Sequence, residues 1–167
     1  MKKVLFLALT ALFTINPVFS QEEKICDLIP SKNGKVFYTE VVNVENSKSI
    51  ELYNNAKMWI ASTFKSAKSV IQSDVEGTSI VVKGRLNYVT DGDSPFILTI
   101  QFKDGRYKYE LTDLYMDMNI AGKKVTYPIE NAPFIKNCSE KPLEGYNKFI
   151  LSFIDELKSG IDVSDDW

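Results

Sequence analysis

Apolar and polar residues alternate along positions 95–115, PFILTIQFKDGRYKYELTDLY, and this pattern predicts a β-hairpin. Asp104 and Gly105 form a two-residue loop of the composition favoured in type I′ turns, which sets Lys103 opposite Arg106. Because successive side chains of a strand point to opposite faces, one face of the hairpin is apolar. We expect that face to carry Phe96, Leu98, Ile100, Phe102, Tyr107, Tyr109 and Leu111. A sheet with one apolar face needs helices or a second sheet against it.

Two segments have the period of a helix instead. In residues 50–65 and again in residues 143–157, apolar side chains recur every three or four positions, which is the stripe of an amphipathic helix packed on one side. Ser47 or Ser49 is available to cap the first helix. Gly160 is expected to follow the second helix.

Further strands are expected on either side of the first helix. Residues 36–44 are β-rich and residues 78–89 alternate, while 66–77 read as a polar stretch and a turn. A shorter strand pair is expected within 116–129, followed by a loop over 127–142. The predicted order is β-α-β-β-β-(β)-α. Both helices can cover the apolar face of one antiparallel sheet, so we expect an α+β fold, a two-layer sandwich with two helices on one face.

The first twenty residues have the pattern of a signal peptide. Lys2 and Lys3 precede an apolar run at 4–15, and a cleavage site is expected near Ser20. The run is shorter than the roughly 20 residues that a membrane-spanning helix needs. We therefore expect an exported protein, periplasmic or secreted, with no transmembrane segment after cleavage. The chain then divides into a signal peptide at 1–20, an N-terminal arm at 21–35, a single α+β domain at 36–158 and a C-terminal tail at 159–167.

The net charge and the absence of histidine make some classes of function less favoured. The net charge is −2, and it becomes −4 after loss of Lys2 and Lys3 because no acidic residue lies in 1–20. A mildly acidic exported protein is a poor nucleic-acid binder, so no nucleic-acid partner is expected. The chain contains no histidine, which removes the commonest general base and the commonest metal ligand.

Cys26 and Cys138 are the two cysteines, and they lie near the two ends of the mature chain. An oxidising compartment would allow them to pair, which makes them a disulfide candidate if their Cα atoms come within about 7 Å. Two free buried thiols are the alternative. Two isolated cysteines without histidine do not have the spacing of a zinc site, so no metal and no cofactor are expected.

One family resemblance covers about half of the chain, residues 34–115. The run GKVFYTEVVNVENSKSIELYNNAKMWIASTFKSAKSVIQ, a strand ending in KGR and the hairpin FILTIQFKDGRYKYELTD resemble the Domain of Unknown Function 4468 family. The clearest pointers are Val41-Val42, Leu52-Tyr53, Trp59 and Asp104-Gly105-Arg106-Tyr107. The resemblance implies a TBP-like fold and an exported protein of a Gram-negative bacterium. It implies no catalytic residues. It also does not imply TATA-box binding, because a shared fold does not bring with it the basic DNA-binding saddle of the TATA-box-binding protein.

No catalytic constellation stands out, and we expect a protein that is not an enzyme. Asp91, Asp93 and Ser94 lie in a loop that lacks the remaining ligands of a calcium loop. Asp113 and Asp117 follow the hairpin and could form a carboxylate pair, so a hydrolase using carboxylates alone is the least favoured alternative.

The predicted outer face of the sheet is rich in cations. It carries Lys83, Arg85, Lys103, Arg106 and Lys108 against Glu110 as its negative charge. Edge protection and solubility are the plain explanation. The functional hypothesis is a non-catalytic binding module that engages an anionic glycan, a lipid head group or another exported protein through this face. A carrier for a lipid or small ligand, with a pocket between helices and sheet, is the main alternative.

Overall fold

The structure is a computed structural model, and it describes residues 26–88, 93–120 and 122–162. The expected signal peptide, the first residues of the arm, Asp91 and the last five residues lie outside this range.

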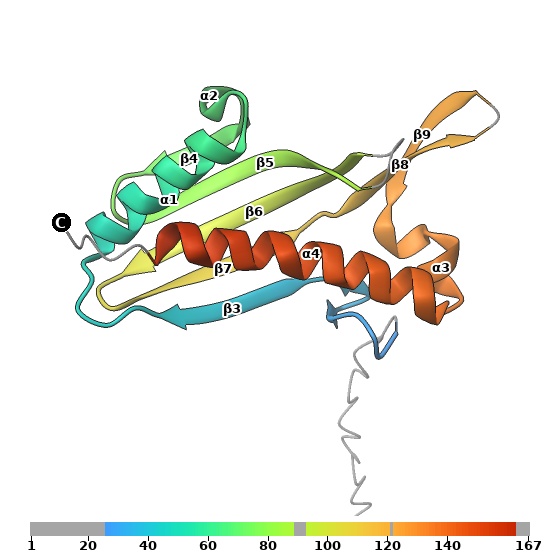
Figure 1. The fold of residues 1–167 in the computed structure, drawn as a ribbon, viewed down its shortest axis with the longest axis horizontal. Coiled ribbons are helices and arrows are strands. Elements are labelled where there is room, and N and C mark those ends of the chain that lie inside the picture. The colour runs from blue at the N-terminus through green and yellow to red at the C-terminus, as the bar shows by residue number, and fades with distance from the viewer. Residues whose placement is uncertain (1–25, 89–92, 121, 163–167) are drawn as a thin grey trace, which may run out of the picture.

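A five-stranded antiparallel sheet forms one layer of the molecule (Figure 1). Its strand order is β3-β7-β6-β5-β4, so β3 and β4 are the edges. The strands are β3 (Tyr38–Asn43), β4 (Ile71–Val75), β5 (Ser79–Asn87), β6 (Asp93–Lys103) and β7 (Arg106–Thr112). The hairpin register predicted from the sequence is confirmed, since Lys103 pairs with Arg106 and Phe102 with Tyr107.

Helices α1 (Ser49–Thr63) and α4 (Glu140–Ile161) form the second layer and lie across one face of the sheet (Figure 1). All the side chains expected on the apolar face are buried: Phe96, Leu98, Ile100, Phe102, Tyr107, Tyr109 and Leu111. The α+β fold class with helices on one face of an antiparallel sheet is thus confirmed.

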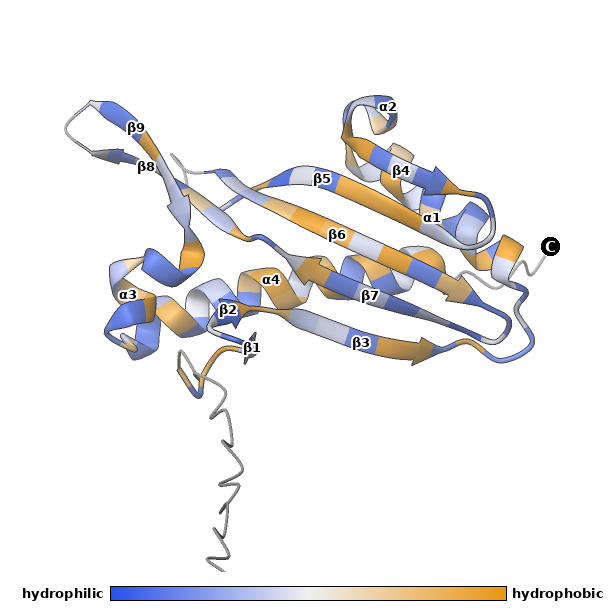
Figure 2. Ribbon diagram, turned by 180° about the vertical axis from the view of Figure 1, so that it is seen from behind, coloured by the Kyte–Doolittle hydropathy of each residue, from blue (hydrophilic) through white to orange (hydrophobic). Residues whose placement is uncertain are grey.

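Smaller elements surround one end of this sandwich. The arm forms a short hairpin from β1 (Ser31–Lys32) and β2 (Lys35–Val36). Beyond the sheet, β8 (Tyr115–Ile120) and β9 (Lys123–Pro128) form a projecting hairpin (Figure 2). A 3₁₀ turn, η1 (Ile129–Asn131), and α3 (Pro133–Lys136) connect it to α4.

Two segments differ from the sequence prediction. The stretch expected to be polar and turn-like contains α2 (Ala67–Val70) and the edge strand β4, which hides no side chain completely. Without a buried face, β4 shows no alternation that a sequence pattern could detect. The expected loop over 127–142 was also wrong, because η1, α3 and the first turn of α4 lie there.

Helix α4 is longer than predicted at both ends and includes residues that were assigned to the tail. Gly160 lies inside it, where a Cβ atom would come within 2.2 Å of Trp59 Cδ1. This glycine therefore serves close packing of α4 on α1, and it does not end the helix.

The prediction of a type I′ turn at Asp104-Gly105 was also wrong. Gly105 has φ +75°, but Asp104 is not among the described residues with positive φ, and type I′ requires both. The carboxylate of Asp104 instead accepts a hydrogen bond from the Ser49 backbone N–H at 2.9 Å and one from Lys48 Nζ at 3.1 Å. The hairpin turn thereby caps α1, whose N-cap is Lys48 and not the expected serine.

Candidate functional site

The strand register places the five cations that were predicted to share a face on the side of the sheet opposite the helices. Figure 2 views the sheet from this open side. Four of them are exposed and Lys108 is partly buried. Their burial alternates with that of the inward side chains on β5, β6 and β7. The shared face expected for Lys83, Arg85, Lys103, Arg106 and Lys108 is present in the structure.

The register divides these cations into two groups. Lys103 pairs with Arg106, and Lys108 lies one row along, opposite Gln101. Lys83 lies opposite Ile97, two rows further along the sheet. Side chains on one face of a strand are two residues apart, so two such rows are four residues, or roughly 13 Å. The five cations therefore do not form one patch. We call Lys103, Arg106 and Lys108 the basic cluster.

The basic cluster lines a hollow of ≈ 440 Å³ at the turn end of the open face. The hollow is lined by the cluster together with Val41, Thr78, Gln101, Phe102 and Tyr107. Cations, an amide and a hydroxyl thus line a surface that also contains apolar atoms. Such a lining suits a ligand that carries sulfate, phosphate or carboxylate groups.

The charge of the cluster is only partly compensated. Lys108 makes an ion pair with Glu110 on the same strand. Asp104, the nearest acidic residue in sequence, is turned toward α1, and its pKa is lowered by the hydrogen bond from the Ser49 backbone. Within the described part of the chain, the side chains of Lys103 and Arg106 have no ion-pair partner.

Arg85 belongs to a different constellation, which the sequence did not reveal. Its Nη1 lies 2.8 Å from Asp117 Oδ2 and 3.3 Å from Asp93 Oδ2. Lys124 Nζ approaches the same Asp117 oxygen at 2.9 Å, and Thr126 donates to the other oxygen. We call these five residues the ion cluster. It ties the projecting hairpin β8–β9 to β5 and β6.

The ion cluster changes the interpretation of the carboxylate pair. Asp117 is only 1 % exposed, and the hydrogen bond from Thr126, followed by those from Lys124 and Arg85, lowers its pKa to about 2. A glycosidase acid needs the opposite shift. Asp113 is exposed and sits in a turn at φ 47°. The two carboxylates therefore have separate structural settings that do not suit an acid/base couple.

Of the segment considered for a cation, Asp93 and Ser94 are described, and both belong to strand β6 and not to a loop. Asp93 takes part in the ion cluster, and Ser94 Oγ donates to the Tyr115 carbonyl at 2.8 Å. Across 26–88, 93–120 and 122–162, no group of three potential metal ligands comes together.

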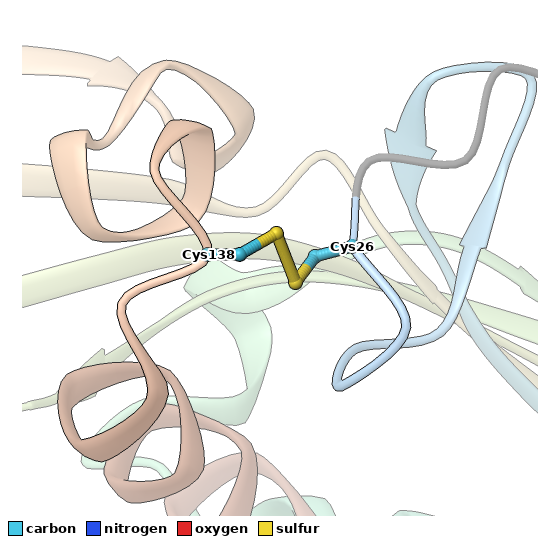
Figure 3. Close-up of a disulfide and its surroundings, with 2 residues drawn as sticks. All are labelled: Cys26 and Cys138. Atoms are coloured by element: carbon cyan, nitrogen blue, oxygen red, sulfur yellow. A yellow bond between two sulfur atoms is a disulfide. The ribbon is translucent and has the colours of Figure 1, made fainter.

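Cys26 and Cys138 form a disulfide, with their Cα atoms 5.9 Å apart (Figure 3). The bond joins the arm to the end of α3. A second tie lies nearby, because Glu130 accepts a hydrogen bond from the Val36 backbone N–H at 2.9 Å and lies 3.8 Å from Lys35 Nζ. The arm is thereby fixed against the domain.

The interface between helices and sheet is filled by aromatic rings. Trp59 lies 5.6 Å from Phe153 and 6.1 Å from Phe64, measured between ring centroids, and Phe96 lies 5.3 Å from Phe153. At Gly84 a Cβ atom would come within 2.5 Å of the Phe96 ring. This packing speaks against a ligand pocket between the two layers.

Comparison with known families agrees with the resemblance noted in the sequence. The family model "Domain of unknown function (DUF4468) with TBP-like fold" matches residues 38–117, which run from β3 into β8. No curated protein matches the chain.

Two solved structures show the same fold. A TBP-like protein from Parabacteroides distasonis has a TM-score of 0.65 and 20% identity, and the match covers 83% of this chain and 100% of that one. A DUF4468 family protein from Bacteroides ovatus has a TM-score of 0.60 and 14% identity, with 84% and 94% covered. At these identities the likeness establishes the fold.

Proposed function

The chain carries a DUF4468 domain with the TBP-like fold over residues 38–117, and on this premise we propose that it is an exported, non-catalytic module that binds an anionic partner through the basic cluster. The observation that carries the proposal is the hollow on the open sheet face, which Lys103, Arg106 and Lys108 surround. The partner is defined by its sulfate, phosphate or carboxylate groups, which a glycan or a lipid head group could supply.

Three features support this function. The face is free of the helices that cover the opposite side of the sheet (Figure 2). Arg106 offers the planar guanidinium that binds oxyanions with two hydrogen bonds. Lys103 and Arg106 lie side by side in register, so that both can approach one anionic group.

Export is part of the same proposal. The disulfide between Cys26 and Cys138 is the chemistry of an oxidising compartment. The basic and apolar pattern of the first twenty residues is that of a signal peptide. Among the described residues, no helix has the length and apolar character needed to cross a membrane.

The test is a pair of double variants with equal charge change. Lys103→Glu with Arg106→Glu should abolish retention on immobilised dextran sulfate at low salt, where electrostatic attraction is least screened. Lys83→Glu with Lys68→Glu changes the net charge by the same amount at exposed positions outside the hollow, and it should leave most of the retention.

Vesicles containing anionic lipid, compared with dextran sulfate, distinguish a head group from a glycan as the source of the anion. Equal loss of retention in both double variants would show that only net charge matters, and the binding function of the cluster would then be rejected. Arg85 is left unchanged in both variants, because its role in the ion cluster would confound binding with folding.

A further inference from the structure

One edge of the sheet is open, and the register shows which backbone groups it offers. The Val44 N–H donates to the Gly105 carbonyl at 2.9 Å, so residue 44 faces β7. Backbone groups alternate sides along a strand, so the N–H and C=O groups of Thr39, Val41 and Asn43 point away from β7. Figure 1 shows β3 along the rim of the sheet, with β7 on its inner side.

The open part of this edge is bounded on both sides. At its start, the Phe37 N–H donates to the Pro30 carbonyl at 3.0 Å, so the arm occupies the edge there. At its end, Asn46 adopts φ 64° and turns the chain toward α1. Residues 39–43 remain, and this window is symmetric about Val41.

The charge of Glu40, on the helix side, is the one device on this edge that protects sheets from pairing, and the others are missing within residues 38–43. The register of β3 with β7 is continuous over six residue pairs, without a bulge, and residues 38–43 contain no proline and no lysine. The opposite edge differs, since the pairing of β4 with β5 is irregular between Ile71 and Ser73. An exposed, regular edge is a template for another strand.

The side chains on this edge suit a second copy of the same strand. Val41, at the centre, is 50 % exposed and points to the open face. Glu40 is the only charged residue of β3, and it is already paired with Lys158. An antiparallel pair centred on Val41 sets Thr39 beside Asn43 of the second copy and places no two like charges opposite each other.

We infer that two copies of the chain pair through β3, antiparallel and with Val41 on the two-fold axis. Residues 39, 41 and 43 then face residues 43, 41 and 39 of the second copy. Each of these three pairs exchanges two backbone hydrogen bonds, and the two Val41 side chains bury each other. The two five-stranded sheets become one continuous sheet.

This pairing also has a consequence for the open face, although the inference does not depend on the proposed function. Val41 is the register partner of Lys108 and lines the hollow. The hollows of the two copies therefore come to lie on either side of the axis. The two Lys108 residues are separated by three strand spacings, roughly 14 Å, which exceeds the screening length of about 8 Å at physiological salt.

The first test measures mass in solution. Light scattering should give twice the mass of the chain at roughly 500 µM and a smaller value on dilution, since an edge contact of this length lies at the small end of stable interfaces. Val41→Lys should be monomeric at both concentrations. Val75→Lys, a valine of equal exposure on the opposite edge, should dimerise like the unchanged chain.

The second test checks the register. In the paired state the two Val41 Cα atoms lie about 5.5 Å apart, within the range that a disulfide spans. Val41→Cys should therefore form a covalent dimer on mild oxidation, and Val75→Cys should not. A chain that stays monomeric at high concentration, or two cysteine variants that cross-link alike, would overturn the inference.

Discussion

Gly160 has a different role at the scale of a single residue from the one its sequence position indicates. A glycine near the end of an apolar stripe is typical of a helix terminus. In α4 it instead gives the indole of Trp59 room to lie against the helix backbone. Trp59 is 7 % exposed, so the contact lies in the core between α1 and α4.

We expect Gly160→Ala to destabilise the protein by about 1–3 kcal/mol, because the added methyl group overpacks the Trp59 contact. Gly145→Ala in the same helix is the matched control. Its Cβ atom would meet Tyr88 Oη at an ordinary 3.8 Å, so it should gain up to about 1 kcal/mol of helix propensity. Chemical denaturation measures both. A gain in stability at position 160 would show that Trp59 does not pack there.

At the scale of elements, the ion cluster ties the projecting hairpin β8–β9 to the sheet. Asp117 is its buried anchor, and Arg85 and Lys124 approach it from β5 and from the hairpin itself. The pKa of Asp117 is lowered to about 2 from 3.8. A lowered pKa means that the folded state binds the proton less tightly than the unfolded state.

The stability contributed by Asp117 is therefore complete above about pH 4 and lost as the pH falls toward 2. Asp117→Asn should remove it at every pH and weaken the pH dependence of unfolding in this window. The loss is about 2–3 kcal/mol, from roughly 1.4 kcal/mol per pKa unit. Denaturant unfolding between pH 2 and 5 tests this, and identical curves for both proteins would contradict it.

Elements with one buried face could be predicted from the sequence, and elements without one could not. The hairpin of β6 and β7 shows the reason, because its apolar residues are the buried ones and its polar residues are the exposed ones, in alternation. Strand β4 is exposed on both faces, and the short α3 follows no period that four residues could display. Prediction of the candidate site from the sequence was limited in a similar way. The shared face of Lys103 and Arg106 could be predicted because side chains alternate between faces along a strand. The hydrogen bond from Arg85 to Asp117 could not, because it joins residues 32 positions apart.

At the scale of the whole molecule, the disulfide joins the first described residue of the arm to the segment just before α4. Cys26 and Cys138 are separated by 112 residues. Closing a loop of that length lowers the entropy of the unfolded chain by an amount worth about 4–5 kcal/mol.

We expect no free thiol in unreduced, denatured protein purified from an oxidising compartment, because both cysteines are in the bond. Maleimide labelling followed by mass measurement tests this, and reduction before labelling should then add two labels. Labelling of both cysteines without reduction would show that the bond does not form. Reduced protein should also unfold at lower denaturant concentration.

The same bond determines how the molecule responds to mechanical force. The sheet and α1 lie between the two cysteines, whereas α4 lies after Cys138. Tension applied between the chain ends therefore passes from the arm through the sulfur atoms into α4 and bypasses the sheet. Such a pull can peel away α4 and release roughly 80 Å of chain, at about 3.3–3.6 Å per residue for the residues from Cys138 to Asp162. The sheet, with its basic cluster and its open edge, stays out of the load path for as long as the disulfide is intact.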